Sequence, residues 1–302
     1  MEWKRVKGDT WVLTGAQLVG VYVLPGDRCV LFDPGSSRLR EPVEAALKER
    51  GLTPAWVACT HMHYDHHETS RYFRETYGAK VCLPQLEADI VRCEQSLKNH
   101  LFNFSMGLVR TDRRLRSLVC PVDRIIAFGE ETVELEGVPF GVLRTPGHSP
   151  DHVCFVTPDD VCFAGDVLMT DDVLETAMVP FVFDMADDLA SKELVARTDH
   201  AAWILCHNGV VYGSVADLAE RNIARIRARI HACRALVTGP MTYSQCYAAV
   251  VTAFSLPVGH PIRAQHLERY IRPYLDYLID SGAAELIELD GAPGLRPAGS
   301  AR

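Results

Sequence analysis

The sequence predicts an α/β fold, because strand and helix patterns alternate along the chain and histidines or aspartates follow several of the strands. Strands are recognised as short runs of β-branched, aromatic and other apolar residues, and helices as runs with one apolar face. The first three strands are spaced as in a β-meander. In the first third of the chain the pattern places strands at 11–13, 18–24, 29–32, 56–59 and 80–83, and helices at 39–50 and 70–77.

Length and composition indicate a globular chain with room for a large core. The chain has 302 residues, of which 48% are hydrophobic, and its formal net charge is −8 at pH 7. This length suggests one large domain and a smaller one. The negative charge disfavours broad attraction to nucleic acid or to an anionic membrane. We therefore expect a small-molecule substrate, and any contact with nucleic acid would have to be local.

The ten cysteines do not form a recognisable disulfide or metal framework. No Cys-x-x-Cys pair occurs, and Cys59, Cys162 and Cys206 lie in apolar strand-like runs, as expected of buried free thiols. No apolar run is long enough to span a membrane, and the first residues do not read as a secretory leader. We expect a cytoplasmic protein in a reducing environment.

Four potential metal ligands lie within the stretch Thr60-His61-Met62-His63-Tyr64-Asp65-His66-His67. In an extended loop alternate side chains share a face, so His61, His63 and Asp65 can point the same way. His66 can reach a neighbouring position after a turn. Imidazoles and carboxylates are zinc ligands, and a core without metal would have to desolvate and hydrogen-bond each of them. The stretch therefore predicts a site for two metal ions rather than a polar surface loop.

Three later strands end in the same way, each with one candidate ligand. His148 follows the run 142–143 after Thr145-Pro146-Gly147, Asp166 follows the run 161–164, and His207 follows the run 203–206. Side chains at the carboxyl ends of several strands can meet at one place, and glycines let the backbone approach closely. We expect these three residues to complete the site that the histidine-rich stretch begins.

This series of His-x-His-x-Asp-His, Pro-Gly-His, Ala-Gly-Asp and a final His resembles the metallo-β-lactamase superfamily of hydrolases, over about residues 33–207. The resemblance implies a four-layer αβ/βα sandwich with the metals at one edge between two sheets. It also implies that Asp33, at a strand end, and Thr60 stabilise the ligand loop from behind. The implied ligands are His61, His63 and His148 for the first metal, Asp65, His66 and His207 for the second, and Asp166 as a bridge. The sequence departs from the commoner family pattern at His67 and at Cys206-His207-Asn208, and neither departure removes a ligand.

Such a site predicts hydrolytic chemistry. Two zinc ions about 3.5 to 4 Å apart can share a water and lower its pKa to near 7, which gives a metal-bridging hydroxide at neutral pH. That hydroxide would be the nucleophile. Asp65 or Asp166 would orient the water or pass its proton to the leaving group, and both are candidate catalytic residues. Iron or manganese are alternatives to zinc.

Residues 84–120 read as a helical insert. Leu97, Leu101, Phe104 and Leu108 recur at helical spacing beside Phe102 and Met106, which gives the insert one apolar face. This face could pack onto the domain, or it could form a wall of the substrate pocket that favours an apolar acyl or aromatic group. The arginines at 110–116 are typical of a solvated helix face.

The C-terminal part is predicted to be a small domain of residues 237–302, after a catalytic domain of residues 1–236. Helices are expected at 212–235, 242–254 and 263–279, a strand at 284–289, a hairpin turn at Asp290-Gly291, and a frayed tail over 292–302. This order resembles a winged-helix module. The layout is similar to the zinc endoribonuclease-like branch of the superfamily, typified by β-lactamase-like protein 2.

The leading hypothesis is a dinuclear zinc hydrolase of a small ester, thioester or lactone. The alternatives are a phosphodiesterase or endoribonuclease of the same fold, an iron-dependent enzyme similar to persulfide dioxygenases, and a binding protein with slow turnover. A homodimer is plausible through the C-terminal module. We expect Cys206, Tyr64, Tyr212 and His152 to pack or to support the ligands rather than to contact the substrate.

Overall fold

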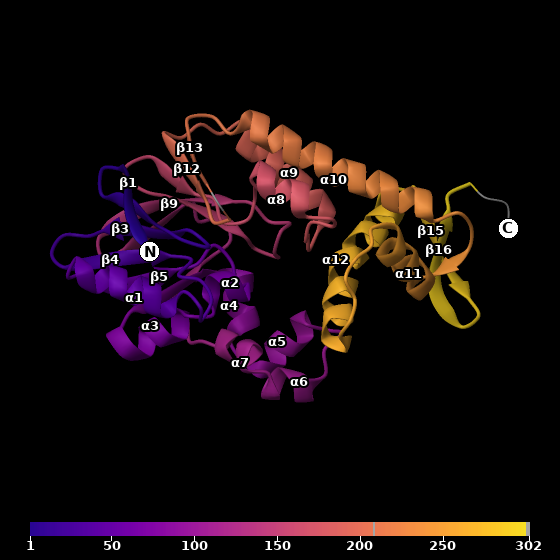
Figure 1. Cartoon of the computed structure of the whole chain (residues 1–302), viewed down its shortest axis with the longest axis horizontal. Coiled ribbons are helices and arrows are strands. Elements are labelled where there is room, and N and C mark those ends of the chain that lie inside the picture. Colours follow the sequence, from indigo (N-terminus) through magenta and orange to yellow (C-terminus); the bar gives the residue numbers. More distant parts are fainter. Residues whose placement is uncertain (208, 300–302) are drawn as a thin grey trace.

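A computed structural model describes residues 1–207 and 209–299. Two β-sheets face one another, and helices cover the outer face of each (Figure 1). None of the helices in these residues is long and apolar enough to cross a membrane.

The first sheet contains seven strands that lie in chain order. Neighbouring strands are antiparallel as far as β4 and parallel from β4 onward, which confirms the expected meander at the start. The carboxyl ends of parallel strands lie at one edge of a sheet, so β4 and β5 deliver Asp33 and the stretch 60–67 to the same place. The strands are β1 (Glu2–Lys7), β2 (Thr10–Thr14), β3 (Val19–Val23), β4 (Arg28–Phe32), β5 (Thr53–Ala58), β6 (Lys80–Pro84) and β7 (Arg124–Ile126).

The second sheet has six strands in the order β13-β12-β11-β10-β9-β8. All its pairs are antiparallel except β11 with β12. Loops that follow β9, β11 and β12 carry His148, Asp166 and His207. The strands are β8 (Thr132–Leu135), β9 (Val138–Arg144), β10 (Val153–Val156), β11 (Val161–Phe163), β12 (Ala202–Leu205) and β13 (Gly209–Tyr212).

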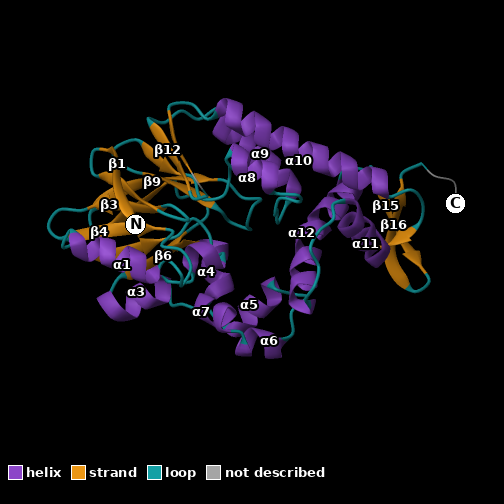
Figure 2. Cartoon of the chain, in the orientation of Figure 1, coloured by secondary structure: helices purple, strands orange, loops and turns teal. Residues whose placement is uncertain are grey.

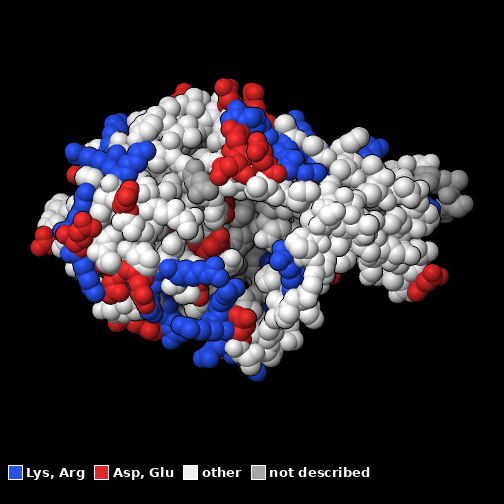
Figure 3. All heavy atoms as spheres, viewed as in Figure 1, with Lys and Arg blue, Asp and Glu red and all other residues white. Residues whose placement is uncertain are grey.

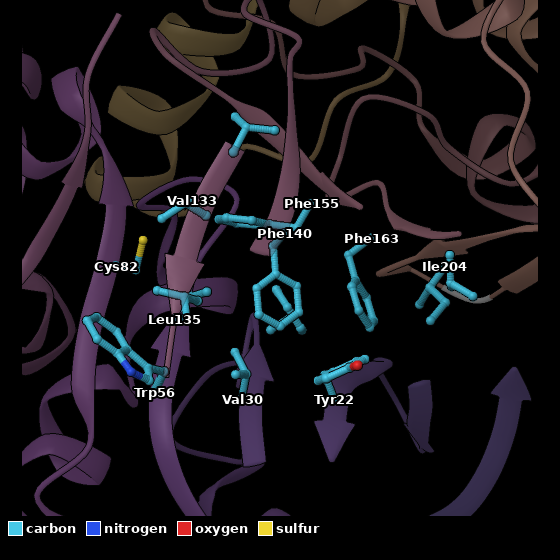
Figure 4. Close-up of a cluster of buried hydrophobic side chains, with 14 of the residues drawn as sticks. Tyr22, Val30, Trp56, Cys82, Val133, Leu135, Phe140, Phe155, Phe163 and Ile204 are labelled. Atoms are coloured by element: carbon cyan, nitrogen blue, oxygen red, sulfur yellow. The ribbon is translucent and has the colours of Figure 1, made fainter. Parts of the chain in front are cut away.

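A core of aromatic and branched side chains fills the space between the two sheets (Figure 4). Phe32 of the first sheet stacks on Phe163 of the second, with ring centroids 4.2 Å apart. Gly20 lies under this pair, and a Cβ there would approach Phe163 to 2.0 Å. The two sheets are therefore locked face to face by close packing.

Helices on the outer faces complete four layers. α1 (Arg40–Glu49) and α3 (Ser70–Tyr77) bury Val43, Leu47 and Phe73 against the first sheet. α10 (Ala216–Leu236) packs Leu218 and Ala219 on Trp203 and Leu205 of the second. The predicted α/β sandwich is confirmed in this arrangement of helix, sheet, sheet and helix.

The insert forms four short helices after β6. Its apolar residues make a cluster of their own, to which Ile262 of the C-terminal part adds. The predicted apolar face thus packs inside the insert, whereas Phe102 beside it is 58% exposed. The helices are α4 (Gln85–Val91), α5 (Glu94–His100), α6 (Met106–Thr111) and α7 (Arg113–Leu118), and the cluster consists of Leu97, Leu101, Phe104, Val109 and Leu118.

The C-terminal part combines helices with a three-stranded sheet of order β14-β16-β15 (Figure 2). Its core is continuous with the loop before α9 (Met185–Ala196), and the Tyr274 hydroxyl donates to the Pro180 carbonyl at 2.9 Å. The winged-helix assignment and the domain boundary at 236/237 stay predictions. The remaining elements are α8 (Asp171–Thr176), β14 (Met241–Thr242), α11 (Tyr243–Ala253), α12 (Pro261–Asp280), β15 (Ala284–Leu289) and β16 (Ala292–Pro297).

Two local expectations are wrong. The long helix begins at Ala216 rather than Tyr212, because Tyr212 ends β13 and pairs with Ala202. Residues 292–297 are not frayed, since the turn at Asp290-Gly291 returns them onto β15 in six consecutive pairs. Asn208 and residues 300–302 lie outside the described residues.

Candidate metal centre

The loop after β5 brings two groups of candidate ligands to the sheet edge. The chain bends at Thr60 and His61, His63 is extended, and the single turn α2 (Tyr64–His67) then begins. This break in conformation separates the early histidines from Asp65 and His66. Together with the loops of the second sheet, it forms one cluster of three histidines and another of two aspartates and two histidines.

The first cluster consists of His61, His63 and His148. Nδ1 of His63 lies 2.9 Å from Nε2 of His61 and 3.0 Å from Nε2 of His148. Neutral imidazoles offer one proton and one lone pair each, so three nitrogens that converge on one point suit a cation better than mutual hydrogen bonds. Three imidazole nitrogens that converge in this way are a donor set that fits a divalent metal.

Asp33 holds the ligand loop from behind through Thr60. Its two carboxylate oxygens accept hydrogen bonds from the Thr60 amide and hydroxyl, both at 2.8 Å. The same hydroxyl lies 3.0 Å from Nδ1 of His61. Because the hydroxyl already donates to Asp33, it accepts from Nδ1 of His61, which leaves the Nε2 lone pair free for a metal.

The second cluster consists of Asp65, His66, Asp166 and His207. Nε2 of His207 lies 3.4 Å from Oδ2 of Asp65 and 3.4 Å from Oδ2 of Asp166. His66 turns Nδ1 toward Asp33 at 3.1 Å and Nε2 toward Asp166 at 3.3 Å. A carboxylate behind a histidine fixes the tautomer in which the other nitrogen can bind a metal.

Asp166 contacts both clusters, since its Oδ2 also lies 3.4 Å from Nε2 of His148. Its backbone amide donates to Nε2 of buried His152, whose Nδ1 is 2.8 Å from the Thr145 hydroxyl. Gly165 is needed beside it, because its φ is +51° and a Cβ would approach His152 to 2.4 Å. His152 therefore supports a ligand, as its place in the sequence suggests.

The loop before His148 is fixed against α9. Gly147 has φ of +120°, and a Cβ there would approach the backbone nitrogen of Asp188 to 2.1 Å. The Ser191 hydroxyl donates to the Pro146 carbonyl at 2.7 Å, and Lys192 forms a buried ion pair with Asp188. α9 therefore fixes the loop that carries His148.

The donor set fits a divalent metal. Oδ1 of Asp166 makes no hydrogen bond among the described residues, and the ring nitrogens of buried His66 have only the carboxylates of Asp33 and Asp166 nearby, at 3.1 and 3.3 Å. Buried polar atoms without partners are rare because leaving them unsatisfied costs free energy, and metal ligation is one reason for them. Imidazole and carboxylate donors favour zinc, iron or manganese over alkali metals.

The two clusters have opposite electrostatic character. Burial lowers the pKa of His63 to about 4 and lowers those of His61 and His148 well below their usual range. The Asp166 carboxylate raises the pKa of His207 to about 10. Burial disfavours the charged form of Asp65, but the adjacent His66 and His207 outweigh it and lower its pKa to about 2.

Sequence reasoning missed Glu87, a buried carboxyl of α4. It accepts hydrogen bonds from the Met62 amide, the Ser149 hydroxyl and the Asp151 amide, at 3.1, 2.7 and 2.9 Å. It therefore ties the loop of His61 and His63 to the loop of His148. Burial raises its pKa to about 7. The only sequence signal for this contact between the two loops is the position of Glu87 near the start of the insert.

Aromatic residues from distant segments also reach the site and were not predicted. The ring of Phe181, between α8 and α9, lies 5.1 Å from His63 and 5.6 Å from His148, and 4.8 Å from Tyr270 of α12. Arg269 beside it donates to the His100 carbonyl of the insert at 2.7 Å. The C-terminal part thus borders the metal centre.

The other residues singled out in the sequence lie in different environments. Cys206 is buried with its thiol 3.4 Å from Oδ2 of Asp33, and burial raises its pKa to about 12, so it is a core thiol. Tyr212 is 58% exposed and points to Lys4, away from the site. Tyr64 is half exposed between the ligands Asp65 and His63.

The fold and these two clusters define a metal-dependent hydrolase. Residues 14–207 match the family model of the metallo-beta-lactamase superfamily. The chain therefore belongs to this superfamily. The probable metallo-hydrolase YqgX of Bacillus subtilis is 30% identical over 59% of this chain and 77% of its own length. The hydroxyacylglutathione hydrolase of Xanthomonas euvesicatoria is 31% identical over 54% of this chain and 52% of its own length, so the chain spans about half of that relative.

Solved structures support the fold over nearly the whole chain. A metallo-beta-lactamase family protein from Thermus thermophilus superposes with a TM-score of 0.72 at 24% identity, and covers 96% of this chain and 98% of that chain. A beta-lactamase domain protein from Burkholderia ambifaria gives 0.69 at 18% identity, over 98% of this chain and 94% of that one. Because both matches include the C-terminal part, its attachment to the sandwich is part of a shared fold.

Proposed function

We propose that this chain is a dinuclear zinc hydrolase that cleaves a small ester, thioester or lactone. The observation that supports it most is the convergence of seven ligand side chains from four loops into two clusters that share Asp166. When bound, two zinc ions would lower the pKa of water toward neutrality and polarise the substrate carbonyl.

The chain's own groups would orient the substrate and move the proton. Asp65 stands at the open side of the second cluster, with a quarter of its side chain exposed, and Gln17 holds its backbone carbonyl at 2.8 Å. Placed there, Asp65 would accept a proton from water and return it to the leaving group. Asp166, which is partly buried between the two clusters, would be a ligand that both metals share.

Phe181 and Tyr270 support an apolar acyl or aromatic group in the substrate. Their rings contact one another, and Phe181 contacts two ligand histidines. Phe183 and Met178 of the same loop are 45% and 41% exposed. An apolar group bound there would exclude water from the reacting carbonyl, which strengthens the electrostatic interactions within the site.

The arginines of α10 are the basic residues that an endoribonuclease could use to bind RNA, but they are largely used within the chain. Arg221 pairs with Asp171, Arg227 pairs with Glu193, and Arg225 donates to the Ala177 carbonyl. Such pairing leaves little free charge on this helix for a polynucleotide. The ester or thioester hydrolase is therefore the better-supported proposal.

Metal content and a substrate panel test the proposal. Protein purified without added metal is analysed by elemental analysis, and turnover is measured on thioesters, lactones, phosphodiesters and RNA. About two zincs per chain with thioester or ester turnover would support it. Iron without hydrolysis, together with oxygen uptake on persulfides, would instead favour the dioxygenase-like alternative.

Asp65→Asn tests the proton role separately. The variant keeps the size of the side chain but lowers its basicity, so we expect turnover to fall by about 100-fold or more. The circular dichroism spectrum should stay unchanged. Turnover at the wild-type rate would remove Asp65 from the mechanism.

A further inference from the structure

Four exposed arginines beside the metal centre form no ion pair with a carboxylate of the described residues. One precedes α1 and three lie on α7, and we call them the arginine rim: Arg38, Arg113, Arg114 and Arg116. Their neighbours differ, since Arg40 pairs with Glu41 and Arg110 pairs with Glu94. In a chain of net charge −8, this is a local excess of positive charge.

The arginine rim stands at the entrance to the site. α7 packs against α2, the turn that carries Asp65 and His66. In the space-filling view, Lys and Arg side chains gather along the lower side of a central hollow, in the region of α7 (Figure 3).

Glu68 fixes both segments of the arginine rim to the ligand turn. It is buried directly after α2, and it accepts hydrogen bonds from the Ser37 amide at 2.7 Å and the Ser117 hydroxyl at 3.4 Å. The other nearby carboxylates are engaged too. Asp112 caps α7 by accepting from the amides of Arg114 and Leu115, and Asp65 faces His207. The two segments that carry the arginines are therefore fixed to the ligand turn, and none of the four guanidinium groups pairs with a carboxylate of the described residues.

We propose that the arginine rim binds the phosphate groups of the leaving thiol of an acyl thioester. This inference rests on the proposed function, because it names the substrate class for the same site. Guanidinium groups match phosphate oxygens in paired hydrogen bonds. Four unpaired cations exceed what one carboxylate can neutralise, so a leaving group with several phosphates, such as a nucleotide-bearing thiol, complements the rim better.

The geometry divides the substrate between two regions. The acyl group would lie against Phe181 and Tyr270, the carbonyl at the metal centre, and the phosphates on the arginine rim. Hydrolysis breaks the carbon–sulfur bond, joins the oxygen of water to the carbonyl carbon, and leaves the carboxylate, the protonated thiol and one released proton. The rim therefore holds the departing product rather than the acyl group.

Thioesters with one acyl group and different thiols test the proposal. We would measure kcat/KM on butyryl thioesters of coenzyme A, glutathione and N-acetylcysteamine, which carry phosphates, carboxylates and no charge respectively. Wild type should favour coenzyme A by at least about 10-fold, and Arg38→Ala/Arg114→Ala should lower that kcat/KM by about 10- to 100-fold, mainly through KM. Turnover of the N-acetylcysteamine thioester should stay within about two-fold, since that thiol does not reach the rim.

Arg197→Ala is the matched control, because Arg197 is exposed, lies at the end of α9 and forms no ion pair among the described residues. It should behave as wild type on all three thioesters. Equal kcat/KM for the three thiols in wild type, or equal losses on all of them in the double variant, would overturn the proposal. A preference for glutathione would replace phosphate by carboxylate and overturn it as well.

Direct binding separates this proposal from the proposed function. Adenosine 3′,5′-bisphosphate is titrated into the metal-loaded wild type and the double variant by calorimetry. Binding that the double variant loses, with its metal content unchanged, supports the arginine rim even if no thioester is cleaved. Equal binding by both proteins contradicts it, and cleavage of RNA that depends on the rim would assign the rim to a polynucleotide instead.

Discussion

The two ligand clusters lie side by side yet are stabilised in different ways. His61 is buried, His63 and His148 are partly buried, and all three are neutral, so their lone pairs are ready for a metal at neutral pH. The second cluster holds a charged His207 between two carboxylates, so a metal that binds there displaces a proton. One cluster is prepared by desolvation and the other by ion pairs, and this difference predicts separable behaviour.

The largest effect is expected for a change at Asp166, which lies between the two clusters. This carboxylate contacts both clusters, so Asp166→Ala should lower the metal content toward zero and turnover by about 1000-fold or more. Elemental analysis after gel filtration measures the first, and steady-state kinetics the second. Asp89→Ala, at an exposed position of α4, is the control. Two retained metals in Asp166→Ala would mean that the clusters do not depend on a shared ligand.

His63→Ala and His207→Ala should separate the clusters. Each removes a ligand from one cluster only, so each variant should retain about one metal per chain and lose about 100-fold or more in turnover. His207→Ala also removes the positive charge between Asp65 and Asp166, and a single metal in the first cluster should therefore remain tightly bound. Loss of both metals from both variants would show that the clusters fill cooperatively rather than independently.

Asp33→Asn should affect both clusters by a smaller amount. Asp33 orients His61 through Thr60 and faces His66 directly. Weakening these contacts should lower metal affinity by about 10- to 100-fold, measured by competition with a chelator. Cys206→Ala touches the same carboxylate only through a weak thiol contact and serves as the control. An Asp33→Asn variant with wild-type affinity would remove Asp33 from the support of the ligands.

The smallest effect is the pH dependence of the metal-free fold. The pKa of His63 in the folded protein is below its ordinary value, so protonation of His63 favours the unfolded chain. The free energy of unfolding should therefore fall as the pH drops from 6.5 toward 4. The pKa of His207 is above its ordinary value, so its stabilisation is present below pH 6.5 and lost as the pH rises toward 10.

Urea midpoints of the metal-free protein between pH 5 and 9 check both signs. His63→Gln should flatten the acid side of the profile, and His207→Gln the alkaline side. If each variant instead flattened the opposite limb, the electrostatic assignment of the clusters would be reversed.

Most of the site could be predicted because its ligands are local in sequence or follow strands. The stretch 60–67 contains four candidate ligands within one loop, and His148, Asp166 and His207 each follow an apolar run. The family model and the solved relatives confirm the superfamily and its sandwich. The ligand roles themselves stay predictions until metal binding is measured.

What could not be predicted depends on contacts between distant segments. Glu87 reads as an ordinary helix residue, and only its burial against Met62 and Ser149 reveals its role. Tyr270 lies more than 200 residues beyond His63 and reaches the site through Phe181. Helix periodicity also placed Tyr212 one element too late, although Asn208-Gly209 and Gly213 are turn signals on either side of the short run that forms β13.

The contact between the insert and α12 has a consequence for how the protein is made. Gln265 and Asn103 exchange two hydrogen bonds across 162 residues, and Arg269 reaches back 169 residues to His100. Closing so long a loop is entropically costly and slow. On the ribosome, the metal ligands are all synthesised before α12 emerges. All seven candidate ligands are therefore available to a metal before the C-terminal helix closes beside them.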